Sequence, residues 1–364
     1  MPRKDLHEKP FDEGTITKLE IFENYAREWL PVFIMGGYKE LWIFDFFAGT
    51  GYDKNGIAGS SIRILQQIKN QINNILQKET KINVCFNEFD NNKYPLLKES
   101  CQQFLSDNPE LESAKVDIVY YNEDFANIFP ERLTTIKKYP SLVYLDQSGM
   151  KFMADKYISE FENIKTTDFL YFISSSYEWR YGDTDAFKSI LKIDIERAKQ
   201  NPYKYIHKSI LEQLREQYKK LSLYPFTIKK GANVYGIIFG ATHPRAVDKF
   251  LKTAWDKNEI NGEANFDIDD DSSKKQLSLF ESKKLTKIES FKQSLRQEIL
   301  DRKIKNNKDA FYYTQKQGHI PSHSKEEISK MKEGKLIDYE GKSPLITYEQ
   351  VCQKKRIVEF NLKK

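Results

Sequence analysis

The amino-acid sequence predicts an α/β protein with a mostly parallel sheet that ends in an antiparallel hairpin. Three observations lead to this prediction: five short apolar runs end in polar or glycine-containing turns, helical patterns follow most of these runs, and two later runs flank the turn Lys-Lys-Gly-Ala-Asn. Strands that alternate with helices form βαβ units, whereas two strands joined by a short turn form a hairpin. A chain of 364 residues has room for one such domain and a smaller module.

The first strand and its neighbouring helices show the pattern most clearly. Residues 15–30 place their apolar side chains on one helical face, and Thr15 or Thr17 is the expected cap. The apolar run 41–46 is the first strand, and it breaks into a turn that contains glycine. Residues 59–77 then form one amphipathic helix, which completes the first strand–helix unit.

The same unit recurs further along the chain. Four more apolar runs are expected to be strands: 82–89, 116–125, 141–149 and 166–176. Helices are expected at 94–106 and 151–164, whereas only a short connection is expected between the third and fourth strands. The sheet is therefore predicted to be mostly parallel, with helices on both faces.

The remaining chain is predicted to hold a helical insertion, the hairpin, a linker and a separate module. Helical patterns occupy about 184–222, and the hairpin follows at 224–242. We therefore place the α/β domain at 1–260, a polar and acidic linker at 261–284 and a C-terminal module at 285–364. The order of helix, turn, short helix, turn and strand in this module resembles a small winged-helix unit, which docks DNA or another protein.

Charge is distributed unevenly over the chain. The net charge is +5, but residues 285–364 carry 18 basic and 11 acidic side chains, which is a net charge of +7. The other residues carry 40 basic and 42 acidic side chains and are therefore at −2. We expect a nucleic-acid footprint first in the basic tail. The alternative is a lysine-rich solvated surface without such a partner.

Several classes of protein are disfavoured. The N-terminus lacks the apolar run of a signal peptide and no apolar stretch is long enough to span a membrane, so we expect a cytoplasmic protein. The cysteines, Cys85, Cys101 and Cys352, match neither a zinc nor a redox motif, and the histidines show no metal-ligand spacing. The turn after the first strand lacks the third glycine of GxGxxG, and no P-loop motif occurs, which disfavours a nicotinamide enzyme and a nucleotide hydrolase.

The residues that follow each strand are the candidate ligands, because open parallel sheets bind ligands at the carboxyl ends of their strands. After the first strand, the candidate cofactor-binding residues are Asp45, Phe47, Ala48, Gly49 and Gly51. The glycines let the backbone approach a ligand closely, and the Asp45 carboxylate can accept hydrogen bonds from a ligand ammonium group. The alternative is a structural turn between strand and helix.

Acidic residues follow the second and third strands. Glu88 comes directly after an apolar run, where a carboxylate can accept both hydroxyl hydrogens of a ribose, while Asp90 can cap the next helix. Asp124 can accept a hydrogen bond from an adenine amine while Phe125 packs on the ring. For Asp124, a solvated loop acid is the alternative.

The fourth and fifth strands lead to the candidate catalytic and substrate-binding residues. Asp146 is the candidate base or orienting group for a target amine, with Gln147 beside it, and a role in binding alone is the alternative. Ser148 can hydrogen-bond a substrate. Three further candidates follow the fifth strand: Tyr177, Trp179 and Arg180. The rings can stack on a flipped base and the guanidinium can bind a phosphate, or the rings can pack beneath the helical insertion.

These elements and motifs carry a resemblance at two levels. Five parallel strands followed by a hairpin resemble the class I S-adenosyl-L-methionine-dependent methyltransferase fold. More specifically, the chain resembles the three-Cys-motif partner proteins over most of residues 15–260. The matching motifs are Lys18 in the first helix, IFDFFAGTGY at 43–52, Gly59-Ser60, FNEFD at 86–90, LDQSG at 145–149 and GIIFGATHPRAVDKF at 236–250. The Asp-Pro-Phe-Gly motif of that family appears here as Asp146-Gln147-Ser148-Gly149.

The resemblance implies S-adenosyl-L-methionine as the cofactor and methyl transfer to DNA or RNA as the activity. It also implies a partner protein with a three-cysteine cluster of the kind that holds an iron–sulfur centre, in a two-protein modification or phage-defence system. The altered motif at the fourth strand affects the target site more than the cofactor site. The alternative is a catalytically inactive scaffold that binds its partner protein or a nucleotide through the same cleft.

Overall fold

The computed structural model divides the chain into two compact units, Met1–Ala246 and Val247–Lys364. This division comes earlier than residue 260, where the sequence places the end of the first domain. The described residues are 10–146, 155–174, 206–231, 233–274 and 284–363. The candidate site residues outside this described part are Gln147, Ser148, Tyr177, Trp179 and Arg180.

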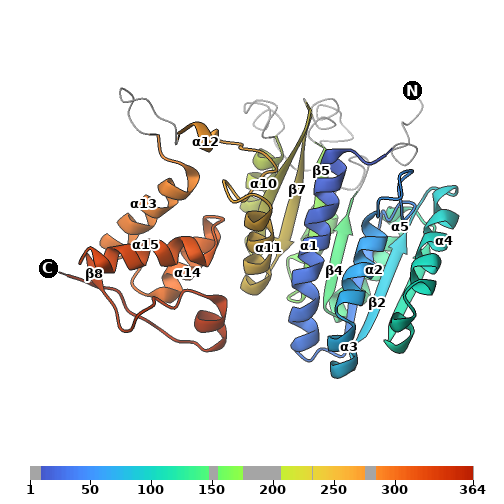
Figure 1. Ribbon diagram of the computed structural model, residues 1–364, viewed down its shortest axis with the longest axis horizontal. Helices are drawn as coiled ribbons and strands as arrows, with labels where there is room; N and C mark the ends of the chain where they lie inside the picture. Colours follow the sequence, from blue (N-terminus) through green and yellow to red (C-terminus); the bar gives the residue numbers. More distant parts are fainter. Residues whose placement is uncertain (1–9, 147–154, 175–205, 232, 275–283, 364) are drawn as a thin grey trace. The chain divides into compact units, whose positions relative to one another are not determined.

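A seven-stranded sheet forms the centre of the first unit (Figure 1), with its strands in the order β3-β2-β1-β4-β5-β7-β6. The strands are β1 Glu40–Asp45, β2 Lys81–Asn87, β3 Val116–Tyr121, β4 Ser141–Leu145, β5 Thr167–Ser174, β6 Ser222–Lys230 and β7 Asn233–Ala241. The first five strands are parallel, whereas β7 is antiparallel to both β5 and β6. The predicted mostly parallel sheet with a terminal hairpin is therefore confirmed, and the fold is Rossmann-like.

Helices cover both faces of this sheet, and alternate residues of each strand point to opposite faces. The helices are α1 Glu13–Met35, α2 Ser60–Asn70, α3 Ile72–Lys78, α4 Lys93–Ser106, α5 Phe125–Lys138, α6 Asp155–Phe161 and α10 Ile206–Gln217. Figure 1 shows α1 and α2 in front of the strands, and on that face the Tyr144 ring lies 4.7 Å from the Phe22 ring of α1. Val143 faces the other side, where apolar side chains of α5, α6 and α10 form a core with it.

Two helix boundaries differ from the prediction. α1 begins after Asp12, which is its N-cap in place of a threonine, because the Asp12 carboxylate accepts a hydrogen bond from the backbone N–H of Thr15 at 2.9 Å. The single helix expected at 59–77 is two helices, α2 and α3, which meet at Gln71. Apolar residues continue at helical spacing across Gln71, so the sequence pattern holds no signal for this break.

Helix α5 occupies the segment for which the sequence predicts only a short connection, so that prediction is wrong. The helix buries Phe125, Ile128, Phe129 and Ile136 on one face, and Pro130 lies inside it. A proline lacks the N–H that would continue the helical ladder and therefore weakens the local helical signal. Burial of the apolar face stabilises the helix in spite of that loss.

The hairpin of β6 and β7 turns at Gly231, whose φ of 56° lies in the left-handed region. Helix α10 is the described part of the predicted insertion. The earlier part of the insertion lies outside the described residues.

The second unit has its own apolar core. Its elements are most of α11 (Pro244–Lys257), α12 Asp271–Lys274, α13 Lys287–Leu300, α14 Asn307–Lys316, α15 Pro321–Glu333, β8 Ile337–Asp338 and β9 Asn361–Leu362. Leu295 of α13, Phe311 of α14 and Ile328 of α15 are fully buried together, and β8 pairs antiparallel with β9. Three helices, α13, α14 and α15, precede β8 in the chain, and β9 follows near its end.

Candidate functional site

The turn after β1 brings the backbone close to its neighbours. Gly49 and Gly51 have φ values of 67° and 90°, in the left-handed region that favours glycine. A Cβ atom at Gly51 would lie only 2.4 Å from the Cβ of Ser100 in α4. The Gly51 carbonyl oxygen also accepts a hydrogen bond from the N–H of Gly59 at 2.7 Å. Glycine at position 51 is therefore required by the turn itself.

Asp45 at the end of β1 is fully buried, and protein groups occupy both of its oxygens. Oδ2 accepts a hydrogen bond from the Ser60 hydroxyl at 2.6 Å, and Oδ1 accepts one from the Phe47 N–H at 3.1 Å. Burial, helped by the charges of Asp146 and Glu88, raises the pKa of Asp45 to about 7 against the lowering effect of these hydrogen bonds. Asp45 therefore fixes the turn to the start of α2.

Glu88 lies directly beside this turn. Its Oε2 accepts a hydrogen bond from the Gly49 N–H at 2.9 Å, and its Oε1 accepts one from the Asp90 N–H at 2.9 Å. Burial raises the pKa of the Glu88 carboxyl, whereas these two hydrogen bonds lower it. Phe89, which the sequence reasoning missed, is 60% exposed and follows Glu88 directly. The sequence signal that could have identified Phe89 is its position directly after the acidic residue at the end of the second strand.

Asn87 is a second residue that the sequence reasoning missed. It is 1% exposed, and its Nδ2 donates to the Phe46 carbonyl at 3.2 Å and to the Glu123 carbonyl at 3.0 Å. Its Oδ1 accepts from the Glu123 N–H at 3.0 Å. The backbone carbonyl of Asn87 also accepts from the N–H of Ala48 at 3.0 Å. Asn87 thus joins the segments that follow β1 and β3 to the end of β2.

Asp124 and Phe125 have structural partners. Asp124 is the N-cap of α5, and its Oδ1 accepts a hydrogen bond from the Ala126 N–H at 2.8 Å. Phe125 is 2% exposed, and its ring centroid lies 5.3 Å from those of both Phe46 and Phe47. The structure therefore places Phe125 in the core beneath the turn, and Asp124 at the rim of the same sheet edge.

Asp146 follows β4 and pairs with a lysine of the first helix. The Nζ of Lys18 donates to Oδ2 of Asp146, and the two side chains are 12% and 18% exposed. The same ammonium group lies 4.7 Å from the centroid of the Phe172 ring in β5. The resemblance includes Lys18, but its contact with Asp146 was not part of the prediction.

Three carboxylates therefore gather at the carboxyl edge of the sheet, from Asp45, Glu88 and Asp146. The charges of Asp146 and Glu88 both act on Asp45, so each of these two carboxylates lies within electrostatic reach of Asp45. Carboxylates beside a glycine turn at this edge can accept hydrogen bonds from hydroxyl and ammonium groups of a ligand. Because Lys18 pairs with Asp146 and Asp45 is fully buried, the partly buried Glu88 is the carboxylate of the three that is best placed to accept hydrogen bonds from a ligand.

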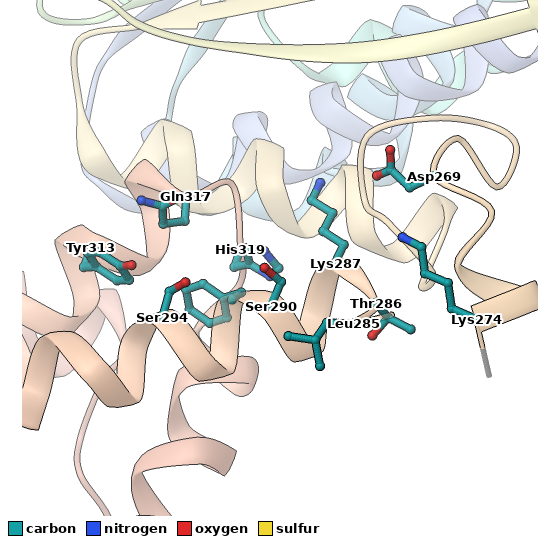
Figure 2. Close-up of a pocket in the computed structure, with 11 residues that line it drawn as sticks. Asp269, Lys274, Leu285, Thr286, Lys287, Ser290, Ser294, Tyr313, Gln317 and His319 are labelled. Atoms are coloured by element: carbon teal, nitrogen blue, oxygen red, sulfur yellow. The ribbon is translucent and has the colours of Figure 1, made fainter. Parts of the chain in front are cut away.

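The second unit contains a separate cavity of about 340 Å³ (Figure 2). Figure 2 shows Asp269 and Lys274 on one side and Tyr313 and Gln317 on the other. Lys274 pairs with Asp271 at 2.7 Å, and the lining residue Lys287 pairs with Glu263 at 3.1 Å. Because acids already neutralise these lysines, the lining does not select one class of ligand.

Two histidines of the second unit contact each other. The Nδ1 atoms of His319 and His323 are 3.0 Å apart, and the His319 ring stacks on Phe291 with centroids 4.0 Å apart. Burial, with nearby lysines, lowers the pKa of His319 to about 2 and that of His323 to about 4. Both rings are therefore neutral at pH 7, and one donates its N–H to the other. Within the described ranges, no group of three or more potential metal ligands occurs.

The positive charge of the tail is only partly available to a partner. Five of its ion pairs are Lys292–Glu326, Lys303–Glu298, Lys330–Glu326, Lys332–Asp338 and Lys354–Glu349. In the part of the tail that the structure describes, exposed cations outside any ion pair are Arg302, Lys305, Lys308, Lys316, Lys325, Lys335, Lys342, Lys355 and Arg356. A nucleic acid would meet these residues first.

The fold and the strand-end acids define an α/β protein with a Rossmann-like sheet and an acidic candidate ligand site. No protein-family model matches the chain, and no curated protein matches it. Among the residues that the structure describes, no helix is long and apolar enough to cross a membrane. The class of the protein therefore rests on its fold and on the geometry of this site.

Proposed function

We propose that the first unit binds S-adenosyl-L-methionine and belongs to the class I methyltransferases. The observation that carries this proposal is the contact between Glu88 and the Gly49 N–H at 2.9 Å, because it places a strand-end acid beside a left-handed glycine turn. A carboxylate in that place can accept the hydroxyl hydrogens of a ribose. The exposed ring of Phe89 offers an adjacent surface for an adenine.

The order of the strands supports the same proposal. A sheet of order β3-β2-β1-β4-β5-β7-β6 with β7 antiparallel is typical of class I methyltransferases. The motifs shared with the three-Cys-motif partner proteins lie along this edge, at 43–52, 86–90 and 145–149. We therefore propose membership of that family, with a three-cysteine iron–sulfur-type protein as partner and phage defence as the setting.

The chain's own residues would have separate roles at the site. Glu88 binds the ribose, the backbone at Gly49 and Gly51 leaves space for the ligand, and Asp45 and Asn87 hold the strand ends at a fixed spacing. The bound cofactor would supply an electrophilic methyl group; the acceptor nitrogen would gain this carbon and lose one proton to water, while the electrons of the carbon–sulfur bond stay on sulfur. Asp146 accepts a hydrogen bond from that nitrogen and orients its lone pair.

Nucleic acid is the proposed methyl acceptor. The exposed cations of the second unit outside any ion pair support this proposal, and so does the succession of helices and short strands, which resembles that of a winged-helix unit. In this proposal the second unit binds the nucleic acid and the first unit transfers the methyl group.

A non-catalytic scaffold is the second candidate. The observation in its favour is that the four predicted acidic site residues already have protein partners: Asp45 bonds Ser60, Glu88 accepts from two backbone N–H groups, Asp124 caps α5, and Asp146 pairs with Lys18. Such a protein would bind a nucleotide or a partner protein at this edge without transferring a methyl group.

Calorimetry with S-adenosyl-L-methionine tests the proposal. We expect wild-type protein to bind and Glu88→Gln to weaken binding by roughly tenfold or more, because a charge-assisted hydrogen bond is lost. Glu79→Gln is the matched control, since that side chain is 76% exposed at the opposite end of β2. Absence of binding by the wild type would refute the proposal. Transfer of a tritiated methyl group to DNA, RNA or the partner protein, lost in Asp146→Asn, would then separate the enzyme from the scaffold.

A further inference from the structure

We propose that Lys18 is a positioning residue for Asp146, and that the pair selects an uncharged nitrogen, as in a nucleobase amine, over a protonated alkylamine as the methyl acceptor. This inference rests on the proposed function, because it concerns the acceptor side of the same site. The pair joins the first helix to the end of the fourth strand, across 128 residues of sequence.

The Lys18 ammonium group is held by two neighbours, Asp146 and Phe172. It donates to Oδ2 of Asp146, it lies 4.7 Å from the Phe172 ring centroid, and it extends from the second turn of α1. At 12% exposure the lysine has little contact with water, so its charge acts on Asp146 with little screening. Within the described residues, Lys18 is the only cation paired with Asp146.

The start of α1 is fixed on two sides, so Lys18 is presented from a rigid support. The Asp12 carboxylate caps the helix and also pairs with Lys230 of β6. The N–H of Phe11 donates to Oδ2 of Asp53 at 2.7 Å, in the loop that follows the glycine turn. A lysine anchored in this way fixes one oxygen of Asp146.

The charge of the pair determines which acceptor fits. A partly buried carboxylate without a counter-ion attracts a cation strongly, but Lys18 already supplies that cation. A protonated alkylamine would therefore meet the like charge of Lys18, and it has no lone pair to receive a methyl group. A neutral amine can donate one N–H to Asp146 and keeps its lone pair for the new bond.

Sinefungin provides a probe, because it carries an amine where S-adenosyl-L-methionine carries the sulfonium methyl group. The affinity of the protein for sinefungin divided by its affinity for S-adenosyl-L-homocysteine measures how strongly the acceptor side of the site attracts or repels a positive charge. Calorimetry on the full chain would compare wild type with Lys18→Met, Lys18→Arg and Asp146→Asn. Lys39→Met is the matched control, since Lys39 is 71% exposed and pairs with Glu79.

We expect Lys18→Met to raise this ratio by roughly fivefold or more, because Asp146 then has no counter-ion. Lys18→Arg keeps the charge and should restore the wild-type ratio, while Asp146→Asn should lower it, since Lys18 is left unpaired. Should Lys18→Met fold poorly, Asp146→Asn tests the same pair from the other side. An unchanged ratio in these variants, with both nucleosides still bound, would overturn the proposed role of Lys18 and leave the proposed function of the site standing. Failure of the wild type to bind either nucleoside would overturn the proposed function and this inference with it.

Discussion

Tyr25 of α1 donates its hydroxyl hydrogen to Oδ2 of Asp168 at 2.7 Å, and both residues are buried. Asp168 lies near the start of β5, at the opposite end of that strand from Ser174. Burial raises the pKa of the Asp168 carboxyl to about 7, although the hydrogen bond from Tyr25 lowers it. This carboxyl is therefore largely protonated in the folded protein below neutral pH, and the free energy of unfolding should depend on pH for that reason.

Asp168→Asn is predicted to flatten the dependence of stability on pH. In the unfolded chain Asp168 ionises near its ordinary pKa of 3.8, whereas in the folded protein it ionises near 7. Its contribution to stability is therefore full below pH 4 and is lost as the pH rises to about 7, by roughly 4 kcal/mol at most. Urea unfolding at pH 4 and pH 7 should show a smaller difference in Asp168→Asn than in wild type. The exposed Asp117→Asn should keep the full difference, and equal behaviour of the two variants would contradict the prediction.

Gly51→Ala is predicted to destabilise the first unit far more than Gly56→Ala. Both glycines have positive φ, 90° and 74°, so an alanine costs about 1 to 2 kcal/mol at either position. Only at Gly51 would the new methyl group lie 2.4 Å from the Ser100 Cβ, while at Gly56 it would meet nothing within 4 Å. We expect a loss of about 3 kcal/mol or more at Gly51, measured by urea unfolding. Similar losses of stability in both variants would show that the close approach to Ser100 of α4 adds nothing to the cost of the alanine at position 51.

Asn87→Leu is predicted to lower both stability and affinity for S-adenosyl-L-methionine. The change leaves the Phe46 carbonyl and both backbone groups of Glu123 without their partner, at a cost of about 3 kcal/mol. Asn83→Leu is a matched control, because Asn83 is also a buried amide of β2 but bonds Glu40 and Leu41 at the other end of the strand. Both variants should unfold more easily in urea. If calorimetry shows equal loss of affinity in both, Asn87 has no special role at the strand ends.

Replacing exposed cations of the tail is predicted to weaken nucleic-acid binding. The double variant Lys355→Gln with Arg356→Gln removes two exposed charges outside any ion pair in the described residues, so the slope of log affinity against log salt should fall by about 2 at most. The control is Lys303→Gln with Lys354→Gln, whose charges are paired with Glu298 and Glu349. Binding to a DNA duplex measured over a salt series checks the difference, and identical slopes would argue against docking by this surface.

Much of the fold follows from local sequence patterns. Strands such as β1 and β4 lie between two helical layers, so both faces are buried and the sequence shows a continuous apolar run. Helix α5 escaped prediction because Pro130 interrupts its pattern, and tertiary burial of Phe129 outweighs that local signal. The N-cap Asp12 was missed because a threonine at either of two nearby positions fitted the apolar spacing equally well.

The candidate site was predictable to the extent that topology alone determines it. Strand ends of a parallel sheet meet at one edge, which is why Gly49 and Glu88 were expected to be near each other and are in contact. The bond between Lys18 and Asp146 joins residues 128 positions apart, and no local pattern encodes such a pair. Asn87 stands within an apolar run, where its amide gave no sign of the carbonyls that it bonds.

The anchoring of α1 sets an order of events during protein synthesis. The acceptor of Lys18 is 128 residues further along the chain, and the partner of Asp12 is 218 residues further along. The ribosome therefore releases α1 long before either partner has been translated, and both contacts are complete only after β6 emerges. A nascent chain that stops before Lys230 lacks the ion pair of Asp12, so the contacts at the start of α1 are among the last of the first unit to be completed.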